Sequence, residues 1–194
     1  MLNIARKLEV TTVEGPGKRS VLWLQGCLKR CPGCCNVGYL PLRQAFFQEE
    51  NEIIAWLMEN QKKHGIEGIT LLGGEPVLQA KGILPIVQWC QENRLSVMLF
   101  TGYSEEELRE LKIPYLQELL SRCDVIIAGP YLRERPEEKR NWVGSSNQKF
   151  IYNSHVYDSS IETTEIDAPT TEMILSQGVI SIQGYPFLNI SLRD

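Results

Sequence analysis

Three thiols stand close together in Cys27-Leu28-Lys29-Arg30-Cys31-Pro32-Gly33-Cys34, at a CxxxCxxC spacing directly after the apolar run 21–24. Thiolates are soft ligands that favour iron–sulfur clusters and zinc, and a loop with such short gaps can wrap one small inorganic body. A 4Fe-4S cluster held by protein alone needs four thiolates, so three clustered ligands imply one iron left open. Adjacent cysteines are poorly placed to reach two corners of one cluster, so we interpret Cys35 as a neighbour of the site.

The length and charge of the chain limit the number of domains and the kinds of partner that we expect. With 194 residues and 43% hydrophobic content, the chain suits a single domain, residues 1–194, with enough apolar residues for a sizeable core. The 20 basic and 24 acidic residues give a net charge of −4. This balance argues against broad electrostatic binding to nucleic acid or to an anionic membrane, and we expect neither among the partners.

The cysteines and the N-terminus indicate the cellular compartment in which the protein works. Residues 1–7 lack the long apolar core of a signal peptide, and no run approaches the roughly 20 apolar residues of a membrane span. Four of the six cysteines fall within nine positions, a distribution that fits a metal cluster in a reducing compartment better than disulfides. We therefore expect a cytoplasmic protein.

Hydrophobic patterning predicts an alternation of strands and helices. The predicted strands lie at residues 8–13, 20–24, 68–72, 95–100 and 124–128, with a strand and turn at 178–186 and a last strand at 187–192. The predicted helices lie at about 46–63, about 83–91, 104–111 and, as a short helix, after Pro114. Such alternation is typical of parallel βαβ units, so we predict an α/β fold, an incomplete TIM-like barrel with its site at the carboxyl ends of the strands.

Three local features refine this pattern. Pro85 is tolerable only in the first turn of its helix. Ser104 and Glu107 form a capping box that marks a helix start. The highly charged segment 131–140 contains a proline and predicts an exposed loop.

Short motifs around the cysteines resemble one known family. They are Glu14-Gly15-Pro16-Gly17-Lys18-Arg19, Gln25-Gly26-Cys27, Cys31-Pro32-Gly33-Cys34 and Asn36. These motifs resemble the opening of the glycyl-radical-enzyme activases, which are radical S-adenosylmethionine (SAM) enzymes, and most closely the activases of anaerobic ribonucleotide reductase. The resemblance implies that Cys27, Cys31 and Cys34 each bind one iron of a 4Fe-4S cluster, while the amine and carboxylate of SAM chelate the fourth.

A structural zinc ion is the alternative occupant of the three thiols. Zinc usually takes a fourth protein ligand in such sites, and neither His64 nor His155 is close in sequence. With the further motifs counted, we favour the cluster.

Gly73-Gly74-Glu75-Pro76 is similar to the GGEP element of the same family, which lies against the methionyl group of SAM. Glycines let backbone groups approach a ligand closely, and a carboxylate accepts hydrogen bonds from an ammonium group. Alone, a glycine pair between a strand and a helix is more often a plain turn. Because the element follows the cysteines by one βα unit, we assign all four residues to SAM binding.

Further positions complete the SAM site that the resemblance implies. Gly33 stands where many radical SAM proteins carry an aromatic residue and the reductase activases carry glycine, and its backbone can approach the adenine. Asn36 belongs to the same motif. Thr101-Gly102-Tyr103 resembles a TGY segment of these activases, so we expect Thr101 and Gly102 to line the SAM pocket. For Tyr103, a surface position after the strand is an equal alternative.

A polar segment resembles the (W/L)RGSxNQ segment of the reductase activases. Small polar residues after a glycine can form a loop that orders against SAM or a partner protein, although the string alone is typical of an ordinary polar loop. The residues assigned to this partner or SAM loop are Trp142, Gly144, Ser145, Ser146, Asn147 and Gln148. Gln183-Gly184-Tyr185-Pro186 resembles the terminal TGFP-like turn of the family.

Two positions depart from the family pattern. Glu14 stands where these activases often have aspartate, which keeps the charge. Ala128 replaces the aspartate of a DG-containing strand end, so a carboxylate is missing there and the specific partner is in question.

Cys90 and Cys123 are isolated on predicted helices, where a free cysteine is usually a small buried hydrophobe, and they do not form a second cluster motif.

The resemblance implies the chemistry of a radical SAM activase. A reduced cluster donates one electron to SAM, and the 5′-deoxyadenosyl radical abstracts hydrogen from a backbone glycine of a partner, expected to be a glycyl-radical enzyme like anaerobic ribonucleotide reductase. Flavodoxin or a similar protein is implied as the reductant. Two alternatives stay open: a small radical SAM enzyme acting on a ribosomal peptide or a small molecule, and a ferredoxin-like electron carrier.

Overall fold

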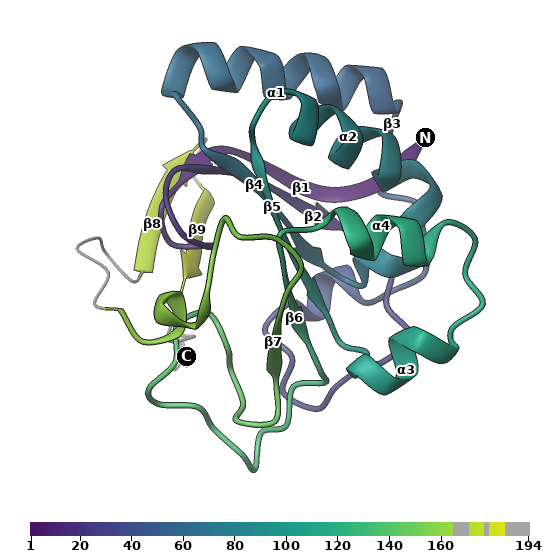
Figure 1. Cartoon of the computed structure of the whole chain (residues 1–194), viewed down its shortest axis with the longest axis vertical. Coiled ribbons are helices and arrows are strands. Elements are labelled where there is room, and N and C mark those ends of the chain that lie inside the picture. Colours follow the sequence, from purple (N-terminus) through teal and green to yellow (C-terminus); the bar gives the residue numbers. More distant parts are fainter. Residues whose placement is uncertain (165–170, 177–178, 185–194) are drawn as a thin grey trace.

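The computed structural model describes residues 1–164, 171–176 and 179–184, and within them the main feature is a seven-stranded mixed sheet (Figure 1). The strands are β1 (Leu2–Thr11), β2 (Arg19–Leu24), β3 (Phe46–Gln48), β4 (Gly68–Gly73), β5 (Ser96–Thr101), β6 (Val125–Ala128) and β7 (Lys149–Tyr152). Their order across the sheet is β3-β1-β2-β4-β5-β6-β7. The central strands β2, β4, β5 and β6 are parallel, and antiparallel strands flank them on both sides.

Helices cover one face of this sheet. The α-helices of the described residues are α1 (Glu50–His64), α2 (Ala80–Glu92), α3 (Glu105–Glu110) and α4 (Leu116–Arg122), and the 3-10 turns are η1 (Val37–Tyr39), η2 (Pro76–Gln79) and η3 (Ser159–Glu162). Figure 1 shows α1, α2 and α4 side by side, and Ile53 of α1 and Ile83 of α2 share one hydrophobic core with Leu71 of β4. None of the helices in the described ranges combines the length and apolar character that a membrane crossing requires.

A separate hairpin follows the sheet. β8 (Thr171–Ser176) pairs antiparallel with β9 (Val179–Gly184). Thr11 Oγ1 donates to Glu172 Oε2 over 2.7 Å, and Gly184 N donates to Glu14 Oε1 over 3.2 Å, so the hairpin is attached to the end of β1 and the turn after it. β9 confirms the predicted strand within 178–186. Tyr185, Pro186 and the predicted strand 187–192 lie outside the described residues.

Most of the predicted elements are confirmed. The α/β class is correct, and the central strands begin and end within one residue of their predicted bounds. The capping box of Ser104 and Glu107 stands in front of α3. The first strand extends further toward the N-terminus than predicted, because residues 2–4 pair with β3. The incomplete barrel stays a prediction.

Two predictions of helix structure are wrong. Residues 46–48 form β3 and not the start of a helix, because they pair with the N-terminal part of β1; α1 begins only after the capping box of Glu49 and Glu52. Pro85 lies in the interior of α2, since the helix already begins at Ala80. Its ring nitrogen has no hydrogen to donate to the preceding turn, and burial of the surrounding apolar residues compensates for the lost bond.

Arg19 is a fully buried cation at the amino end of β2. Its guanidinium donates to Thr70 Oγ1 over 2.8 Å, to Ser96 Oγ over 2.9 Å and to Tyr157 OH over 3.1 Å. Further acceptors are the backbone carbonyls of Pro16, Ile69 and Ser96. Burial lowers the pKa of Arg19, and its hydrogen bonds tie together the amino ends of three neighbouring strands.

We expect Arg19→Met to lower the free energy of unfolding by about 3 kcal/mol, because the buried acceptors lose their donors and relief from burying a cation offsets only part of that loss. Arg19→Lys should cost about 1–3 kcal/mol, since one ammonium group cannot reach acceptors on all sides. Urea unfolding measures both. An unchanged stability of Arg19→Met would mean that burying the cation costs as much as its hydrogen bonds contribute.

Candidate functional site

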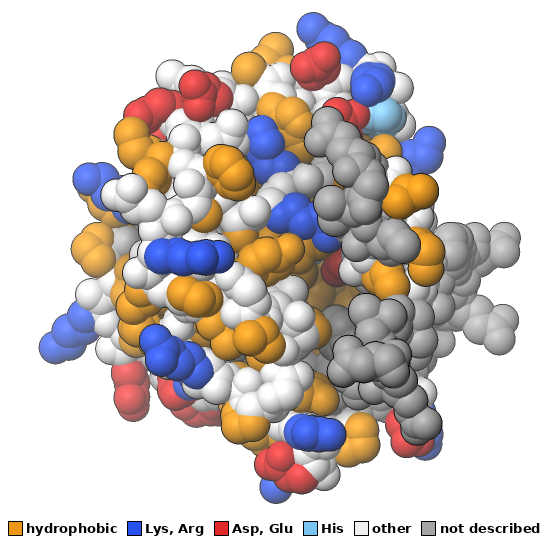
Figure 2. All heavy atoms as spheres, turned by 180° about the vertical axis from the view of Figure 1, so that it is seen from behind, with side chains coloured by type: hydrophobic (Ala, Val, Ile, Leu, Met, Phe, Trp, Pro, Cys, Tyr) orange, Lys and Arg blue, Asp and Glu red, His pale blue; other side chains and the backbone are white. Residues whose placement is uncertain are grey.

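The four parallel strands bring four loops to one edge of the sheet. β2 pairs with β4 so that Leu24 lies opposite Gly73, and β5 pairs with β6 so that Thr101 lies opposite Ala128. Ligand sites of open α/β sheets gather at this carboxyl edge. A cavity of about 1270 Å³ is lined from all four loops. Seen from behind, the surface is hollowed near its middle, with Lys and Arg side chains at the border of the hollow (Figure 2).

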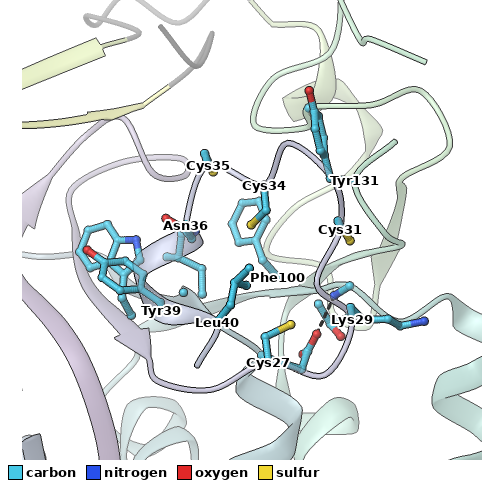
Figure 3. A pocket seen from close by; sticks show the side chains of 18 of the residues that line it. Cys27, Lys29, Cys31, Cys34, Cys35, Asn36, Tyr39, Leu40, Phe100 and Tyr131 are labelled. Atoms are coloured by element: carbon cyan, nitrogen blue, oxygen red, sulfur yellow. Dashed lines mark hydrogen bonds between the residues drawn. The ribbon is translucent and has the colours of Figure 1, made fainter. Parts of the chain in front are cut away.

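The three cysteines of the CxxxCxxC motif line this cavity from one loop, residues 25–40, which we call the cysteine loop (Figure 3). Cys27 is 5% exposed, whereas Cys31 and Cys34 are half-buried. Cys35 also lines the cavity, and Figure 3 places it beyond Cys34 as seen from Cys27. The structure therefore brings the predicted cluster ligands to one wall.

The thiols differ in their surroundings. Burial raises the pKa of the Cys27 thiol, against hydrogen bonds from the backbone of Arg30 and Lys29. A side-chain hydrogen bond with Cys35 lowers the pKa of Cys34 and raises that of Cys35. Because the thiolate is the form that binds metal, the hydrogen bond from Cys35 favours the metal-binding form of Cys34.

Gly33 and Asn36, which the motif assigns to the SAM site, lie on the same loop and line the cavity. Gly33 has φ +79°, a left-handed conformation that favours glycine. A Cβ there would meet Tyr131 at 3.4 Å, an ordinary contact. Backbone conformation, and not lack of space, therefore explains why glycine precedes the third cysteine.

Gly73 and Gly74 allow two loops to touch. A Cβ at Gly73 would stand 2.4 Å from Leu24 N, and one at Gly74 would stand 2.4 Å from Gly26 O. Gly74 N donates to Leu24 O over 2.7 Å, and Glu75 N donates to Gly26 O over 2.8 Å. Both glycines line the cavity, but Gly73 permits close approach to the end of β2 and Gly74 to the cysteine loop, whereas we expected approach to a ligand.

Glu75 is fully buried and belongs to the lining of the cavity. Its Oε2 accepts from Gly102 N over 2.8 Å and its Oε1 from Val77 N over 3.3 Å. Burial raises the pKa of Glu75 to about 7, against these hydrogen bonds and one from Thr101. The carboxyl group thus joins the loop after β4 to the loop after β5. Pro76 is buried beside it and is not among the residues that line the cavity.

Residues 101–103, at the end of β5 and after it, differ in whether they line the cavity. Thr101 and Gly102 line the cavity. Tyr103 does not, and its predicted alternative as a surface residue is wrong, because it is 9% exposed and packs in the hydrophobic core. Its ring lies beneath Lys29, whose Nζ is 4.5 Å from the ring centroid.

The predicted partner or SAM loop contains lining and supporting residues. The lining residues are Trp142, Gly144 and Gln148. Ser145 Oγ accepts from Leu132 N over 3.1 Å, and Asn147 Nδ2 donates to Pro130 O over 2.8 Å. Ser146 is exposed. The buried Ser145 and the half-buried Asn147 therefore fasten the chain that follows β6.

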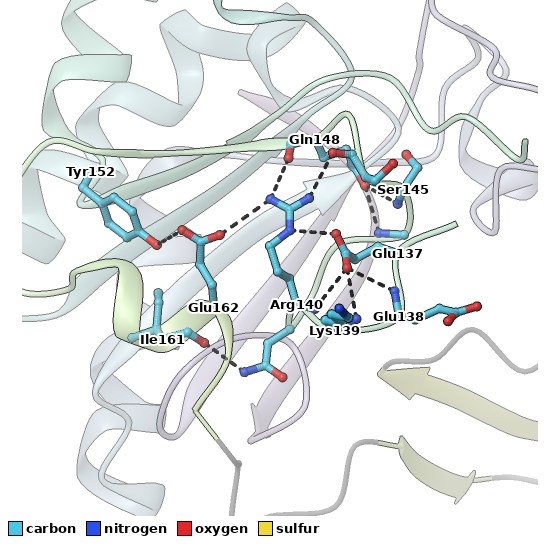
Figure 4. A network of polar contacts seen from close by, with 12 residues as sticks. Glu137, Glu138, Lys139, Arg140, Ser145, Gln148, Tyr152, Ile161 and Glu162 are labelled. Atoms are coloured by element: carbon cyan, nitrogen blue, oxygen red, sulfur yellow. Dashed lines mark hydrogen bonds and ion pairs between the residues drawn. The ribbon is translucent and has the colours of Figure 1, made fainter. Parts of the chain in front are cut away.

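Arg140 connects the charged segment 131–140 to this loop (Figure 4). Its guanidinium donates to Glu137 Oε2 over 2.7 Å, to Gln148 O over 3.0 Å and to Ser146 O over 3.2 Å. Burial raises the pKa of Glu137, but hydrogen bonds from Lys139 and Arg140 outweigh it and lower the pKa to about 2. Most of the segment 131–140 is exposed and irregular, as predicted, and this network attaches it through Glu137 and Arg140, which are half-buried.

Sequence reasoning missed several residues that line the cavity. They include Arg6, Trp23, Lys29, Tyr39, Phe100, Tyr131 and Glu137. Trp23 and Phe100 stand at the ends of predicted strands, and the alternation of side chains along a strand is the signal that could have found them. Lys29 and Tyr39 lie in an irregular loop without such periodicity. Among the described residues, no group of three His, Cys, Asp or Glu side chains is gathered closely enough to hold a single metal ion.

Comparison with known proteins gives consistent matches. Residues 13–151 match the family described as 4Fe-4S single cluster domain, and they include the whole cysteine loop. A protein of Enterobacteria phage T4 is 33% identical over 157 residues, covering 79% of this chain and 96% of that protein. A protein of Vibrio cholerae is 32% identical over 156 residues, covering 76% and 96%. Both relatives are named anaerobic ribonucleoside-triphosphate reductase-activating protein.

Among solved structures, QueE from Escherichia coli has a TM-score of 0.44 and 15% identity, covering 66% of this chain and 70% of that one. A score this low carries no conclusion about either chain.

We expect Gly74→Ala to disturb the contact between the two loops. The added Cβ would collide with backbone atoms, which cannot rotate away as a flexible side chain could. The thermal midpoint and the iron bound after reconstitution should both fall, with a stability loss of about 1–3 kcal/mol. Gly38→Ala is the matched control in the same cavity, since nothing lies within 4 Å of its Cβ. Equal behaviour of the two variants would contradict the assigned role of Gly74.

The pH dependence of stability should depend on Glu75. Its pKa is raised by burial from 4.5 to about 7, so the folded chain holds a proton that the unfolded chain releases within this interval. The free energy of unfolding therefore falls as pH rises through the interval. Glu75→Gln should lose this part of the decline, as measured by urea unfolding of the iron-free chain at both ends of the interval. The same slope in both proteins would rule Glu75 out as its source.

Proposed function

The chain belongs to the 4Fe-4S single cluster domain family and to the anaerobic ribonucleoside-triphosphate reductase-activating proteins, and from this premise we propose that it is a radical SAM activase that installs a glycyl radical in anaerobic ribonucleotide reductase. These matches confirm the resemblance found in the motifs. The observation that carries the proposal is the meeting of the three cysteines and the loop after β4 at one cavity.

The residues around the cavity fit an iron–sulfur cluster together with a second ligand. Three thiols are a soft donor set suited to such a cluster, and we assign Cys27, Cys31 and Cys34 to it. The cavity of about 1270 Å³ is larger than the roughly 300–1,000 Å³ of common small-molecule sites, which leaves room for SAM. The SAM contacts that we propose are Gly33, Asn36, Gly73, Gly74, Thr101 and Gly102, with Glu75 and Pro76 in support.

When bound, these groups supply one-electron cleavage of the SAM sulfonium to methionine and a 5′-deoxyadenosyl radical, which takes a hydrogen atom from the partner's glycine. The chain itself binds, orients and excludes water. Trp23, Phe100 and Trp142 line the cavity with aromatic surface, which lowers the local polarity. Glu75 holds two of the loops at a fixed separation through its hydrogen bonds to backbone amides.

The partner and the wider architecture follow from the same proposal. A protein substrate has to bring its glycine to the cavity, and the hollow in Figure 2 offers a path from the surface. Flavodoxin or a similar protein supplies the electron. We infer one radical SAM domain over residues 1–194, with the sheet as an incomplete barrel, and thiolate ligands of this kind favour the reducing cytoplasm.

Ala128 favours a second candidate, a small radical SAM enzyme that acts on a peptide or a small molecule. Ala128 is 2% exposed and pairs with Thr101 at the carboxyl edge. The carboxylate that the resembling activases carry at this strand end is therefore absent here. The cofactors and the cavity would be the same, and only the substrate would differ.

The proposal is tested anaerobically with the reconstituted, dithionite-reduced protein and SAM. We expect 5′-deoxyadenosine to form with the wild type and not with Cys31→Ala, because loss of one of three thiolates removes a ligand that the cluster requires. With an anaerobic ribonucleotide reductase present, a glycyl radical should appear in that protein by electron paramagnetic resonance.

Cys35→Ser is the matched control, because it removes the neighbouring thiol, keeps a hydrogen-bond donor for Cys34 and should leave cleavage intact. Cleavage without a protein radical would favour the second candidate. An intact cluster that fails to cleave SAM would contradict both and support an electron carrier.

A further inference from the structure

Lys29 stands between the first two cysteines and reaches out of the cysteine loop to α3. Its Nζ donates to both carboxylate oxygens of Glu107 over 2.6 Å. The same ammonium group lies 4.5 Å from the centroid of the Tyr103 ring. The Lys29 side chain is 20% exposed and that of Glu107 is 46% exposed, so the ion pair lies at the surface while the Lys29 side chain itself is largely sheltered. Figure 3 shows the side chain leading away from the thiols.

The stem of Lys29 also packs where three loops meet. A Cβ at Gly102 would stand 3.2 Å from Lys29 Cγ and 3.4 Å from Glu75 Oε2. Gly102 N donates to that same oxygen. The cysteine loop, the loop after β4 and the loop after β5 therefore touch at Gly102, and Lys29 is the contribution of the cysteine loop.

The acceptor of Lys29 is held in place before the contact forms. Ser104 N donates to Glu107 Oε2 over 2.8 Å, and Glu107 N donates to Ser104 Oγ over 3.3 Å, which completes the capping box of α3. Tyr103 is fixed by its burial in the core. A preorganised acceptor loses little conformational freedom when the ion pair forms, and such a pair is stronger than one between two mobile side chains.

We propose that Lys29 is a positioning residue, whose ion pair with Glu107 and contact with Tyr103 hold the cysteine loop closed against the end of β5 and thereby fix the thiols around the iron–sulfur cluster. The proposal rests on the proposed function only in assigning the cluster to these thiols. The free energy of a cation–π contact combined with an ion pair is similar to the free energy that separates the open and closed states of a loop.

The positive charge gives a second, separable effect. The reduction potential of an iron–sulfur cluster responds to nearby charge and to the polar groups around its ligands. Loss of the Lys29 cation leaves the Glu107 carboxylate behind and disfavours the reduced cluster. Loss of the Glu107 charge leaves the cation and favours it. Loop closure, in contrast, is lost in both cases.

The experiment compares Lys29→Met, Glu107→Gln and the double variant in the reconstituted protein without SAM. Hydrogen–deuterium exchange of the peptide spanning 28–34 should accelerate about fivefold in each single variant. The double variant should exchange no faster than Lys29→Met, because Glu107→Gln removes only the ion pair that Lys29→Met already breaks. In an electron paramagnetic resonance titration, the potential should fall in Lys29→Met and rise in Glu107→Gln.

Three controls separate positioning from general damage. Lys63→Met removes a different ion pair, that with Glu9 Oε2 at 2.9 Å, and should change neither readout. Lys29→Arg should restore slow exchange, and Tyr103→Phe should retain it because the ring stays. Exchange within β4 should match the wild type in all variants, which shows that the sheet is folded.

Unchanged exchange in Lys29→Met would overturn the proposal, as would potential shifts without any change of exchange, since the residue would then act by charge alone. Neither readout requires SAM. Failure of the wild type to cleave SAM would therefore contradict the proposed function while leaving the test of Lys29 intact.

Discussion

The parallel pairing of β2 with β4 is the contact on which the site depends. It places Leu24 opposite Gly73, so the cysteine loop and the loop after β4 leave the sheet side by side. Two glycines then let the backbones touch where any side chain would collide. A slip of one residue in this register would turn every side chain of β2 to the other face and separate the cysteines from the cavity.

Buried polar groups hold the parallel strands together at their amino ends and at their carboxyl ends. Arg19 gathers hydroxyl and carbonyl acceptors at the amino ends of β2, β4 and β5. Glu75 gathers backbone amides at the carboxyl edge. Each group is fully buried and costs free energy unless its partners are in place. The satisfied network therefore specifies one arrangement of strands and loops, which a purely apolar core would define less sharply.

The loops above this frame carry the chemistry that family membership implies. Cysteine thiols, aromatic side chains and small residues surround one cavity, and the segment after β6 closes it through Arg140 and its partners (Figure 4). Lys29 links the most irregular of these loops to a helix that is already capped. In this protein, catalytic geometry comes from contacts between loops, and the sheet sets only where each loop begins.

The sequence by itself determined the alternation of strands and helices, the three thiols and the family. Local patterns carry these features, because burial of a parallel strand demands an apolar run and a capping box needs only Ser104 and Glu107. It did not predict β3 or β7, whose short strands pair with distant partners, nor the interior place of Pro85. The meeting of Lys29, Glu75 and Gly102 was decided only by the tertiary structure, because those contacts join loops whose approach is fixed by strand register and not by any local pattern.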